Sequence, residues 1–420
     1  MIHEQPAANS LFQADRNPHD SRMLEFEEAL KRILEAVPAP VSERVALAEA
    51  HGRVLTEQVL APIDLPGFDN SAMDGYAVRA AEVALAGRAS PVRLRLAGRV
   101  EAGQTFAGEL ASGTCVRIFT GSPLPPGADA VVMQEDTEPE QSEILIQEAV
   151  KPWENIRFRG EDVKCGAPLI ASGEILTAGR LGLLAAVGSS HVLVSGQPVV
   201  GVLATGSELK EPGKPLEPGQ IYESNRIALA ELTRRAGGKP KIFPLIPDVL
   251  AETRAALADA FNQCDMVVTS GGVSVGEMDF VKRAVEESGG DVQFWKVAIK
   301  PGRPFVLGRC QGKLLFGLPG NPVSALVTFL LLVRPALLGW QGARELRLPF
   351  HNGKLAEALA NPGERRHFMR VKMMADGSIC SAGIQASHVL SATAAANGLV
   401  DVPPRTTLPQ GSSVQVWRWD

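Results

Sequence analysis

The chain has 420 residues, which is too many for one hydrophobic core and predicts three or four folded units. Its 45% hydrophobic and 21% charged residues are typical of a globular protein, and its net charge of -5 argues against non-specific binding of nucleic acid. The 5 cysteines are widely spaced and form no CxxC pair, so the sequence signals neither a disulfide framework nor a zinc site.

The N-terminal stretch and the apolar segments predict a cytoplasmic protein that does not cross a membrane. Residues 1–20 have neither a basic start nor an apolar stretch, so no secretory signal is expected. The most apolar segment, ALVTFLLLVRPALLGW, is interrupted by Arg334 and Pro335. It falls short of the ~20 apolar residues that a bilayer crossing requires.

The first predicted helix covers residues 21–37. Within it, Phe26, Leu30 and Ile33 fall on one face, which is the spacing of an amphipathic helix. Pro38 follows directly and ends the helical pattern.

Short β-type runs separated by glycine and proline turns occupy residues 61–160 and predict a β-rich domain. A second helix is expected over residues 178–187, and we expect it to pack against the first. The β-rich domain is then an insertion into a discontinuous helical or linker domain, formed by residues 21–60 and 161–194.

Strands and helices alternate over residues 195–343, which is typical of a mostly parallel sheet covered by helices on both faces. The expected strands are VVGVLAT, KIFPLI, MVVTS, VQFWKVAI and LLFGL, and the expected helices cover residues 224–236, 249–262, 280–288 and 322–338. Residues 344–420 return to short strands and predict a β-barrel-like domain. The fold class is therefore α/β multidomain, with one three-layer α/β domain.

Residues 68–79, FDNSAMDGYAVR, combine Asp69 and Asp74 with an amide, a hydroxyl and a glycine. Residues of these types are typical of a tight turn. A loop that presents carboxylates to a charged partner needs the same residues. The stretch alone leaves both interpretations open.

Three glycine-marked loops follow predicted strands: ATGSEL, TSGGVSVGEMD and GLPGNPVS. The carboxyl ends of parallel strands meet at one edge of a sheet, where ligands bind. Glycines allow backbone N–H groups to turn toward an anion, and a following helix adds its positive end. The loops predict a phosphate-bearing ligand, contacted by Ser270, Gly271, Gly272, Gly320 and Asn321.

Helix capping is the alternative interpretation of several residues in these loops. Asn321 followed by Pro322 is a favourable N-cap and first-turn pair. Asp248 and Asp279 also precede predicted helices. Capping and ligand contact are not mutually exclusive.

Basic side chains lie in the segment QFWKVAIKPGRPF. Strand alternation places Lys296 and Lys300 on one face, and Arg303 follows. A strand that is buried on both faces normally has a continuous apolar sequence, so two lysines in such a strand are unusual. They predict contact with a phosphate, because lysine binds a compact anion as a point charge. The alternative is a solvated edge strand.

Acidic residues accompany these basic ones: Asp74, Glu161, Asp162, Glu208, Asp248 and Asp279. Carboxylates beside phosphates imply a divalent cation between them, and magnesium is the usual one. The residue pattern does not name the substrate.

Eight segments carry a family resemblance: FDNSAMDGYAVR, RIFTGSPLPPGADAVVMQE, NIRFRGEDV, ATGSEL, QIYESN, TSGGVSVGEMD, FWKVAIKPGRPF and GLPGNPVSA. In this order they resemble the molybdopterin molybdenumtransferase family, known as MoeA and related to the gephyrin E domain. The resemblance extends from about residue 21 to the C-terminus.

This resemblance implies an elongated homodimer of four-domain subunits with its active site between the subunits. It implies that molybdate and adenylated molybdopterin are the substrates, that the pyrophosphate bond is cleaved with release of AMP, and that Mg²⁺ is the metal, with Zn²⁺ as the alternative. It also implies transient contacts with the molybdopterin adenylyltransferase and with the molybdoenzymes that receive the cofactor.

Site residues carry over where this sequence matches the family's motifs. The implied catalytic residues are Asp74, Thr120, Asp162, Glu208 and Asp279, and the implied metal ligands are Glu208, Asp248 and Asp279. The implied substrate contacts are Lys296, Lys300, Arg303, Pro319, Pro322 and, in the segment GIQASHVLSATAAANGL and just before it, Ser387 and Arg370. Asp74 of one chain is expected to serve the sheet of the other. Arg303 stands where the family often has lysine, which keeps the charge.

Two other functions remain open at this point. One is ATP-dependent adenylation of molybdopterin by the α/β domain. The other is a non-catalytic scaffold like the gephyrin E domain, which the several acidic residues argue against.

Overall fold

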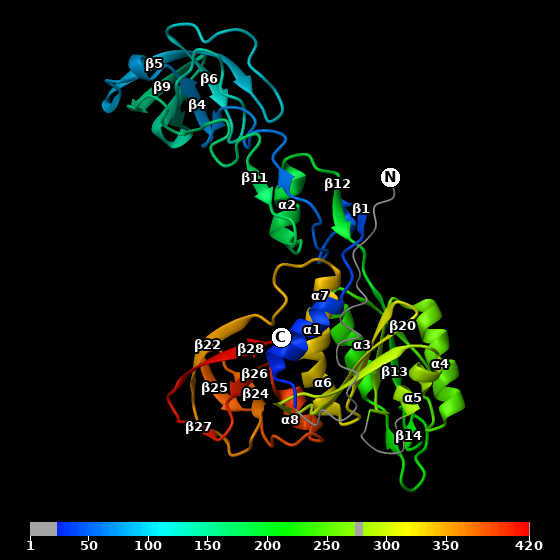
Figure 1. Cartoon of the computed structure of the whole chain (residues 1–420). Helices are drawn as coiled ribbons and strands as arrows, with labels where there is room; N and C mark the ends of the chain where they lie inside the picture. Colours follow the sequence, from blue (N-terminus) through cyan, green and yellow to red (C-terminus); the bar gives the residue numbers. More distant parts are fainter. Residues whose placement is uncertain (1–22, 274–279, 420) are drawn as a thin grey trace.

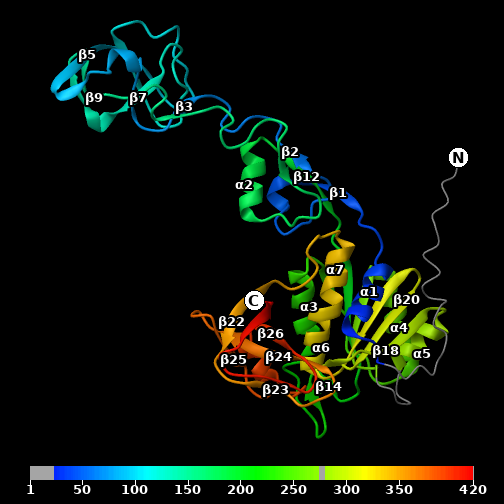
Figure 2. The ribbon, with the colours of Figure 1, turned by 60° about the vertical axis from the view of Figure 1, so that its left-hand side comes forward.

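The computed structural model describes residues 23–273 and 280–419. The molecule is elongated, with a β-rich unit at one end, a narrow middle unit, and an α/β unit packed beside a C-terminal barrel at the other end (Figure 1). Figure 2 shows the same separation from a second direction.

The α/β unit is built on a six-stranded sheet in the order β16-β13-β17-β21-β20-β18. Its strands are β13 (Val199–Ala204), β16 (Lys239–Ile242), β17 (Met266–Ser270), β18 (Asp291–Lys296), β20 (Pro304–Cys310) and β21 (Lys313–Leu318). The first three and β21 are parallel, whereas β20 runs antiparallel to both β21 and β18. The mostly parallel sheet is thus confirmed. Strand β20 was not predicted, because the prolines and glycine of KPGRP obscure its start.

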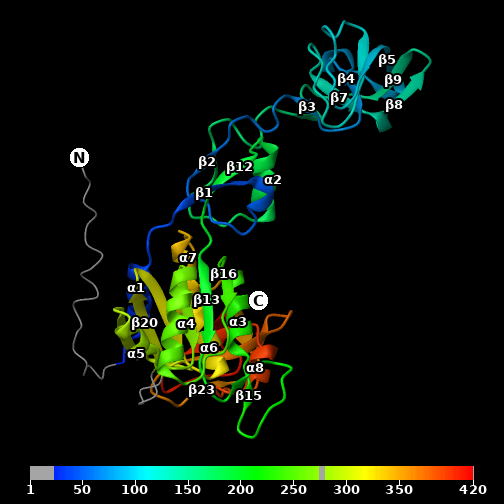
Figure 3. The same ribbon diagram turned by 90° about the vertical axis from the view of Figure 1, so that its right-hand side faces the viewer.

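Helices cover both faces of this sheet, as predicted. They are α1 (Phe26–Ala36), α3 (Asn225–Arg235), α6 (Pro322–Thr328) and α7 (Arg334–Trp340) on one face, and α4 (Leu250–Gln263) and α5 (Phe280–Glu287) on the other (Figure 3). Alternate residues of β17 serve the two layers, since Val268 joins the core under α6 and Val267 joins the core under α4.

The predicted helix over residues 322–338 is a continuous run of α6, the π-helical turn η4 (Phe329–Val333) and α7. By length and composition this run, Pro322–Trp340, could cross a membrane, with a mean hydropathy of 1.8. Its apolar window is 78% buried inside the protein, however, so it serves here as a core helix.

The first helix, α1, packs differently from the expectation. Its residues Phe26 and Ile33 join the core formed by η4, α7 and the sheet. The second helix, α2 (Ala178–Ala186), instead packs Leu184 against Leu55 and Val194 in the middle unit. The predicted contact between the two helices is therefore wrong: the apolar face of α1 is used by the larger α/β core.

The middle unit is made by segments that precede and follow the β-rich unit in sequence. Strand β1 (Ser42–Ala46) pairs with β12 (His191–Ser195), and β2 (Val59–Leu60) pairs with β11 (Pro168–Ile170). Farther out, β3 (Asn70–Ser71) pairs with β10 (Ile156–Arg157). A short 3-10 turn, η1 (Leu47–Glu49), follows β1. The domain boundaries that were predicted from the sequence remain predictions.

The β-rich unit is an open six-stranded sheet in the order β7-β4-β6-β5-β9-β8. Its elements are β4 (Gly75–Val78), η2 (Ala80–Glu82), β5 (Gly87–Val100), β6 (Thr114–Ile118), β7 (Ala130–Met133), η3 (Gln134–Asp136), β8 (Thr137–Glu140) and β9 (Glu143–Glu148). Both faces are apolar: Tyr76 and Val132 lie in one core, and Ala77 and Val131 lie in the other.

The C-terminal unit is a closed barrel, as predicted. It contains β22 (Phe350–Leu355), β24 (Arg366–Met373), β25 (Ser378–Ser381), β26 (Gly398–Val402) and β28 (Ser413–Arg418), and the pairing of β24 with β26 closes it. The remaining elements are β23 (Leu359–Asn361), α8 (Leu390–Ala395) and β27 (Thr406–Leu408). Strand β19 (Ile299–Lys300) comes from the α/β unit and pairs with β24, which joins the two units.

Candidate active site

Two of the three predicted glycine loops meet at the carboxyl ends of β13 and β17. Gly271 and Gly272 have φ of +87° and +66°, in the left-handed region that favours glycine. A Cβ atom on Gly271 would lie 2.5 Å from the carbonyl oxygen of Thr205, and one on Gly272 would lie 2.9 Å from its Oγ1. Only glycine permits this close approach of the two loops.

Asn225, the first residue of α3, ties the third loop to the second. Its Nδ2 donates to Ser270 Oγ at 2.7 Å and to the Gly320 carbonyl at 2.8 Å. Ser270 Oγ in turn donates to the Pro319 carbonyl at 3.3 Å. The loops at the carboxyl ends of β17 and β21 are thus one hydrogen-bonded cradle. Asn225 was not among the predicted site residues, although it ends the segment QIYESN.

A buried ion pair fixes the first turn of α3 and with it Asn225. The Glu223 carboxylate accepts hydrogen bonds from the backbone N–H and the Nε of Arg226, both at 2.9 Å. Arg226 also donates to Glu211, which raises its pKa despite burial. Glu223 follows β15 (Ile221–Tyr222), which pairs with β14 (Leu209–Lys210). This pairing holds together the two ends of the loop that follows Glu208.

Asp248 contacts the first loop and does not cap α4. The backbone N–H of Ser207 donates to Asp248 Oδ2 at 3.1 Å, and the backbone N–H of Asp248 donates to Ser207 Oγ at 3.0 Å. Helix α4 begins at Leu250 with Val249 as its N-cap. Glu208, next to Ser207, is exposed. The predicted acids at residues 208 and 248 therefore lie on two loops that are pinned together.

Two further predictions concern Asn321 and Asp279. Asn321 occupies the N-cap position of α6, but its side chain makes no capping hydrogen bond and is exposed. Asp279 lies outside the described residues. Within residues 23–273 and 280–419, no three His, Cys, Asp or Glu side chains are grouped closely enough to hold a metal ion.

The basic segment after β18 does not form one continuous strand. Strand β18 ends at Lys296 on the edge of its sheet. The backbone N–H of Ala298 then donates to the Leu24 carbonyl at 2.8 Å. Lys300 is exposed on β19, whereas Val297 and Ile299 are fully buried. The predicted separation of lysines from apolar residues is right, but Lys296 lies on an edge strand, which agrees with the alternative interpretation for that residue.

Positive charge concentrates where β19 meets the barrel. Arg365 donates from Nη1 to the Ile299 carbonyl at 2.8 Å, and its pKa is lowered by burial and by the nearby charge of Arg303. His367 pairs in register with Lys300 and is 3% exposed, with no hydrogen-bond partner on either ring nitrogen among the described residues. Burial and the neighbouring cations lower the pKa of His367 to about 4, so its ring is neutral at pH 7.

Arg370 is buried behind the Ser387 loop. It is 1% exposed, and its guanidinium donates to the carbonyls of Val389 at 2.9 Å and of Ile384 at 2.9 Å. The loop that it holds docks on α6, because the backbone N–H of Val323 donates to the Ser387 carbonyl at 3.2 Å. The structure thus places Ser387 beside the PGNP loop and gives Arg370 a positioning role.

The predicted acids of the β-rich unit lie far from these loops in one chain (Figures 1 and 3). Asp74 Oδ1 accepts hydrogen bonds from the backbone N–H and the hydroxyl of Thr120, each at 2.8 Å. These bonds lower the pKa of Asp74. Asp162 is exposed beside Arg157 in a pocket of about 390 Å³ near the base of this unit. A single chain does not bring Asp74, Thr120 and Asp162 together with Glu208.

Comparison with known proteins identifies the family. Residues 24–188 match the model of the MoeA N-terminal region (domains I and II), residues 201–339 match the probable molybdopterin-binding domain, and residues 352–419 match the MoeA C-terminal region (domain IV). The chain belongs to the MoeA family. A molybdopterin molybdenumtransferase of Haemophilus influenzae is 43% identical over 382 residues, which covers 89% of this chain and 93% of that protein.

Further relatives extend the similarity over nearly the whole chain. Molybdopterin molybdenumtransferase 2 of Mycobacterium tuberculosis is 40% identical over 94% of this chain and 99% of that protein. The crystal structure of a molybdopterin biosynthesis MoeA protein from Pyrococcus horikoshii superposes with a TM-score of 0.81, at 32% identity over 95% of this chain and 100% of that chain. The four-part architecture is therefore that of the family.

Proposed function

We propose that this protein is a transferase that inserts molybdenum from molybdate into molybdopterin. The observation that carries the proposal is its 43% identity, over 89% of the chain, to a relative named molybdopterin molybdenumtransferase. The loop cradle formed through Asn225 presents glycine-rich backbone at the carboxyl ends of the strands, which supports a ligand that carries phosphate groups.

The finer proposal is that molybdopterin arrives in its adenylated form. The chain then cleaves the anhydride: an oxygen of water or of molybdate forms a bond to phosphorus, the P–O bond of the anhydride breaks, and AMP leaves with the electron pair. Backbone N–H groups of the glycine loops and the charges of Lys300 and Arg303 stabilise the negative charge that develops on the phosphate oxygens. Ser387, beside the PGNP loop, is proposed to lie on the molybdate side.

The metal of the reaction is also part of the proposal. Magnesium is commonly held by one or two carboxylates together with substrate phosphates. Exposed Glu208, and Asp248 oriented by Ser207, supply such a pair, and Asp279 is proposed as a third ligand. When bound, the ion neutralises phosphate charge. Zinc is the alternative metal for the same ligands.

The position of the β-rich unit supports a homodimer in which each active site uses two chains. Asp74 and Thr120 are exposed or half-buried, and the geometry of one chain separates them from the loop cradle. We propose that they face the loops of the partner subunit, as an isologous dimer would permit. The cytoplasm is the proposed location.

The test is release of AMP from adenylated molybdopterin, measured with and without molybdate. We expect molybdate-dependent release by the wild type and loss of at least 100-fold in Glu208→Gln and Lys300→Gln, an estimate of about 3 kcal/mol of transition-state stabilisation. Formation of the adenylate from molybdopterin and Mg-ATP would instead support an adenylyltransferase. Absence of both activities in the folded dimer would support a scaffold.

A further inference from the structure

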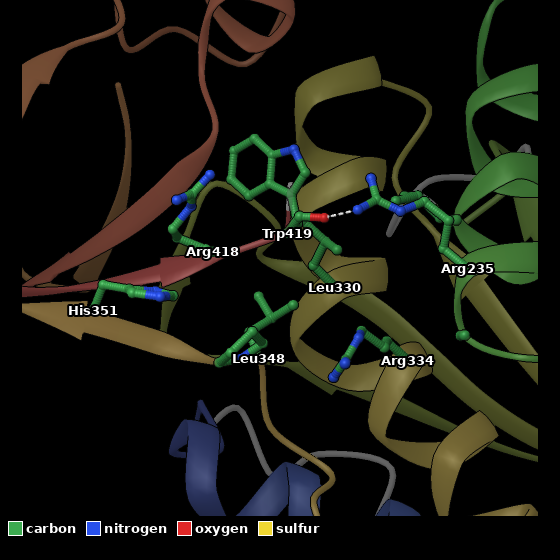
Figure 4. Close-up of a pocket in the computed structure, with 10 residues that line it drawn as sticks. Arg235, Leu330, Arg334, Leu348, His351, Arg418 and Trp419 are labelled. Carbon is green, nitrogen blue, oxygen red and sulfur yellow. Dashed lines mark hydrogen bonds between the residues drawn. The ribbon is translucent and has the colours of Figure 1, made fainter. Parts of the chain in front are cut away.

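A pocket of about 350 Å³ lies between the α/β unit and the C-terminal barrel (Figure 4). We name it the arginine pocket. Its lining residues are Leu232, Arg235, Ala236, Leu330, Arg334, Leu348, Pro349, His351, Arg418 and Trp419. None of these residues is acidic, three are arginines and one is a histidine, so the lining carries a strong excess of positive charge.

The arginine pocket is separate from the loop cradle. Helix α3 begins at the cradle with Asn225 and reaches the pocket with Arg235, its last residue. Ten residues of α-helix span about 15 Å. The core helix likewise begins at the cradle with Pro322 and lines the pocket with Arg334, about 18 Å farther along at the same rise. A ligand in the pocket therefore does not occupy the site proposed for molybdopterin.

The charges of the pocket repel one another. Burial lowers the pKa of Arg334, and the charge of Arg235 lowers it further. One nitrogen of Arg334, Nη1, donates to the Leu346 carbonyl at 3.0 Å. Buried Nε of Arg418 has no acceptor among the described residues. A buried guanidinium N–H without an acceptor and two mutually repelling guanidinium groups are complementary to an anion.

The remaining walls are apolar. Leu232 and Leu330 belong to the main core, and Trp419 packs against that core from the barrel side. Arg235 donates to the carbonyl of Trp419, which holds the residue that follows β28 at the pocket (Figure 4). The volume lies at the lower end of the range for small-molecule sites.

From these features we propose that the arginine pocket binds a small organic anion, namely a phosphate ester or a carboxylate attached to an apolar or aromatic group. The anionic group contacts Arg235, Arg334 and Arg418, and the apolar group packs against Trp419 and the leucines. This proposal does not depend on the function proposed for the loop cradle.

Isothermal titration calorimetry of the full chain with phenyl phosphate tests the proposal. Benzoate replaces the phosphate by a carboxylate, inorganic phosphate lacks the apolar group, and benzyl alcohol lacks the charge. We expect saturable binding of phenyl phosphate or benzoate that is at least 10-fold tighter than that of the other two probes. Absence of saturable binding by both aromatic anions overturns the proposal.

Variants locate the binding site. Arg235→Ala and Arg418→Gln should each weaken binding of the aromatic anion at least 10-fold. Arg234→Ala is the matched control, because it removes the same charge from the neighbouring position of α3, where Arg234 pairs with exposed Glu231 and does not line the pocket. Lys300→Gln tests binding at the loop cradle and should keep the parent's affinity.

Two results overturn the location. One is unchanged affinity in both pocket variants. The other is an equal loss in Arg234→Ala or Lys300→Gln. Thermal unfolding of each variant checks the fold, and exposed Arg235 decides the question if Arg418→Gln does not fold.

Discussion

One carboxylate oxygen of Asp74 accepts both the backbone N–H and the hydroxyl of Thr120. The backbone bond is the larger cause of the lowered pKa of Asp74, and the hydroxyl bond adds to it. The carboxylate is thereby kept ionised and fixed in direction at the tip of β4. Thr120, which the sequence presents only as part of the motif FTG, is thus the residue that orients Asp74.

Thr120→Val should reduce activity more than Thr120→Ser, because serine keeps the hydroxyl donor and valine removes it. Loss of the hydroxyl bond should raise the pKa of Asp74, and activity should then fall on the acidic side at a higher pH than in the wild type. The pH dependence of AMP release, with NMR titration of the Asp74 carboxyl, measures both effects. Equal activity and pH profiles for the two variants would contradict the orienting role.

Mixed dimers test whether each active site uses two chains. Asp74→Asn and Glu208→Gln should each be inactive as homodimers. If Asp74 serves the partner's loops, random mixing yields heterodimers with one intact site, and about one quarter of wild-type activity should return. The measurement is AMP release after the two variants are unfolded and refolded together. No recovery, in a sample shown to contain heterodimers, argues for sites within one chain.

Gly271→Ala should destabilise the protein by about 1–3 kcal/mol, because the new Cβ would lie 2.5 Å from the Thr205 carbonyl in a backbone conformation that favours glycine. Gly289→Ala is the matched control. Gly289 has a similar φ of +76°, but no atom of the described residues lies within 4 Å of its added Cβ. Urea unfolding of both variants separates the cost of close contact from that of the backbone angle, and equal losses would contradict the close approach of the loops.

His367 should make stability fall as the solution becomes acidic. Its folded pKa of about 4 lies below the ordinary value of 6.5, so the unfolded chain takes up a proton that the folded chain excludes. The stabilisation is complete above pH 6.5 and is lost as the pH falls toward 4, by up to about 3 kcal/mol. His367→Leu should remove this slope from urea unfolding curves, whereas a variant of exposed His388 should keep it.

The sequence predicted the elements whose pattern is local. The short continuous apolar runs of β13 and β17, and the apolar run from Pro322 to Trp340, were sufficient to predict strands, a helix and a layered α/β unit. The barrel and the β-rich unit followed from short strands between turns. The basic segment is interrupted after Lys296, but Val297 and Ile299 are still buried apart from the lysines, as the sequence predicted.

Features that depend on distant contacts were not predicted. The predicted packing partner of α1 was wrong. An amphipathic pattern indicates that one face of a helix is buried, but it does not indicate which element buries that face. Asn225 was missed because its role requires Ser270 and Gly320 to lie beside it, 45 and 95 residues away in sequence. His367 was missed for the same reason, since Lys300 reaches it only through the pairing of β19 with β24. The burial of Arg370 was not predicted, because it cannot be read from the residue type.

The pairing of β3 with β10 brings together the two chain segments that lead into and out of the β-rich unit. Asn70 lies opposite Arg157 and Ser71 lies opposite Ile156, so the backbone departs and returns at positions about 5 Å apart. All strands of the outer sheet, β4 to β9, fall between these two points. The intervening stretch is therefore a self-contained cassette, and a turn of a few residues is long enough to close the gap that its excision would leave.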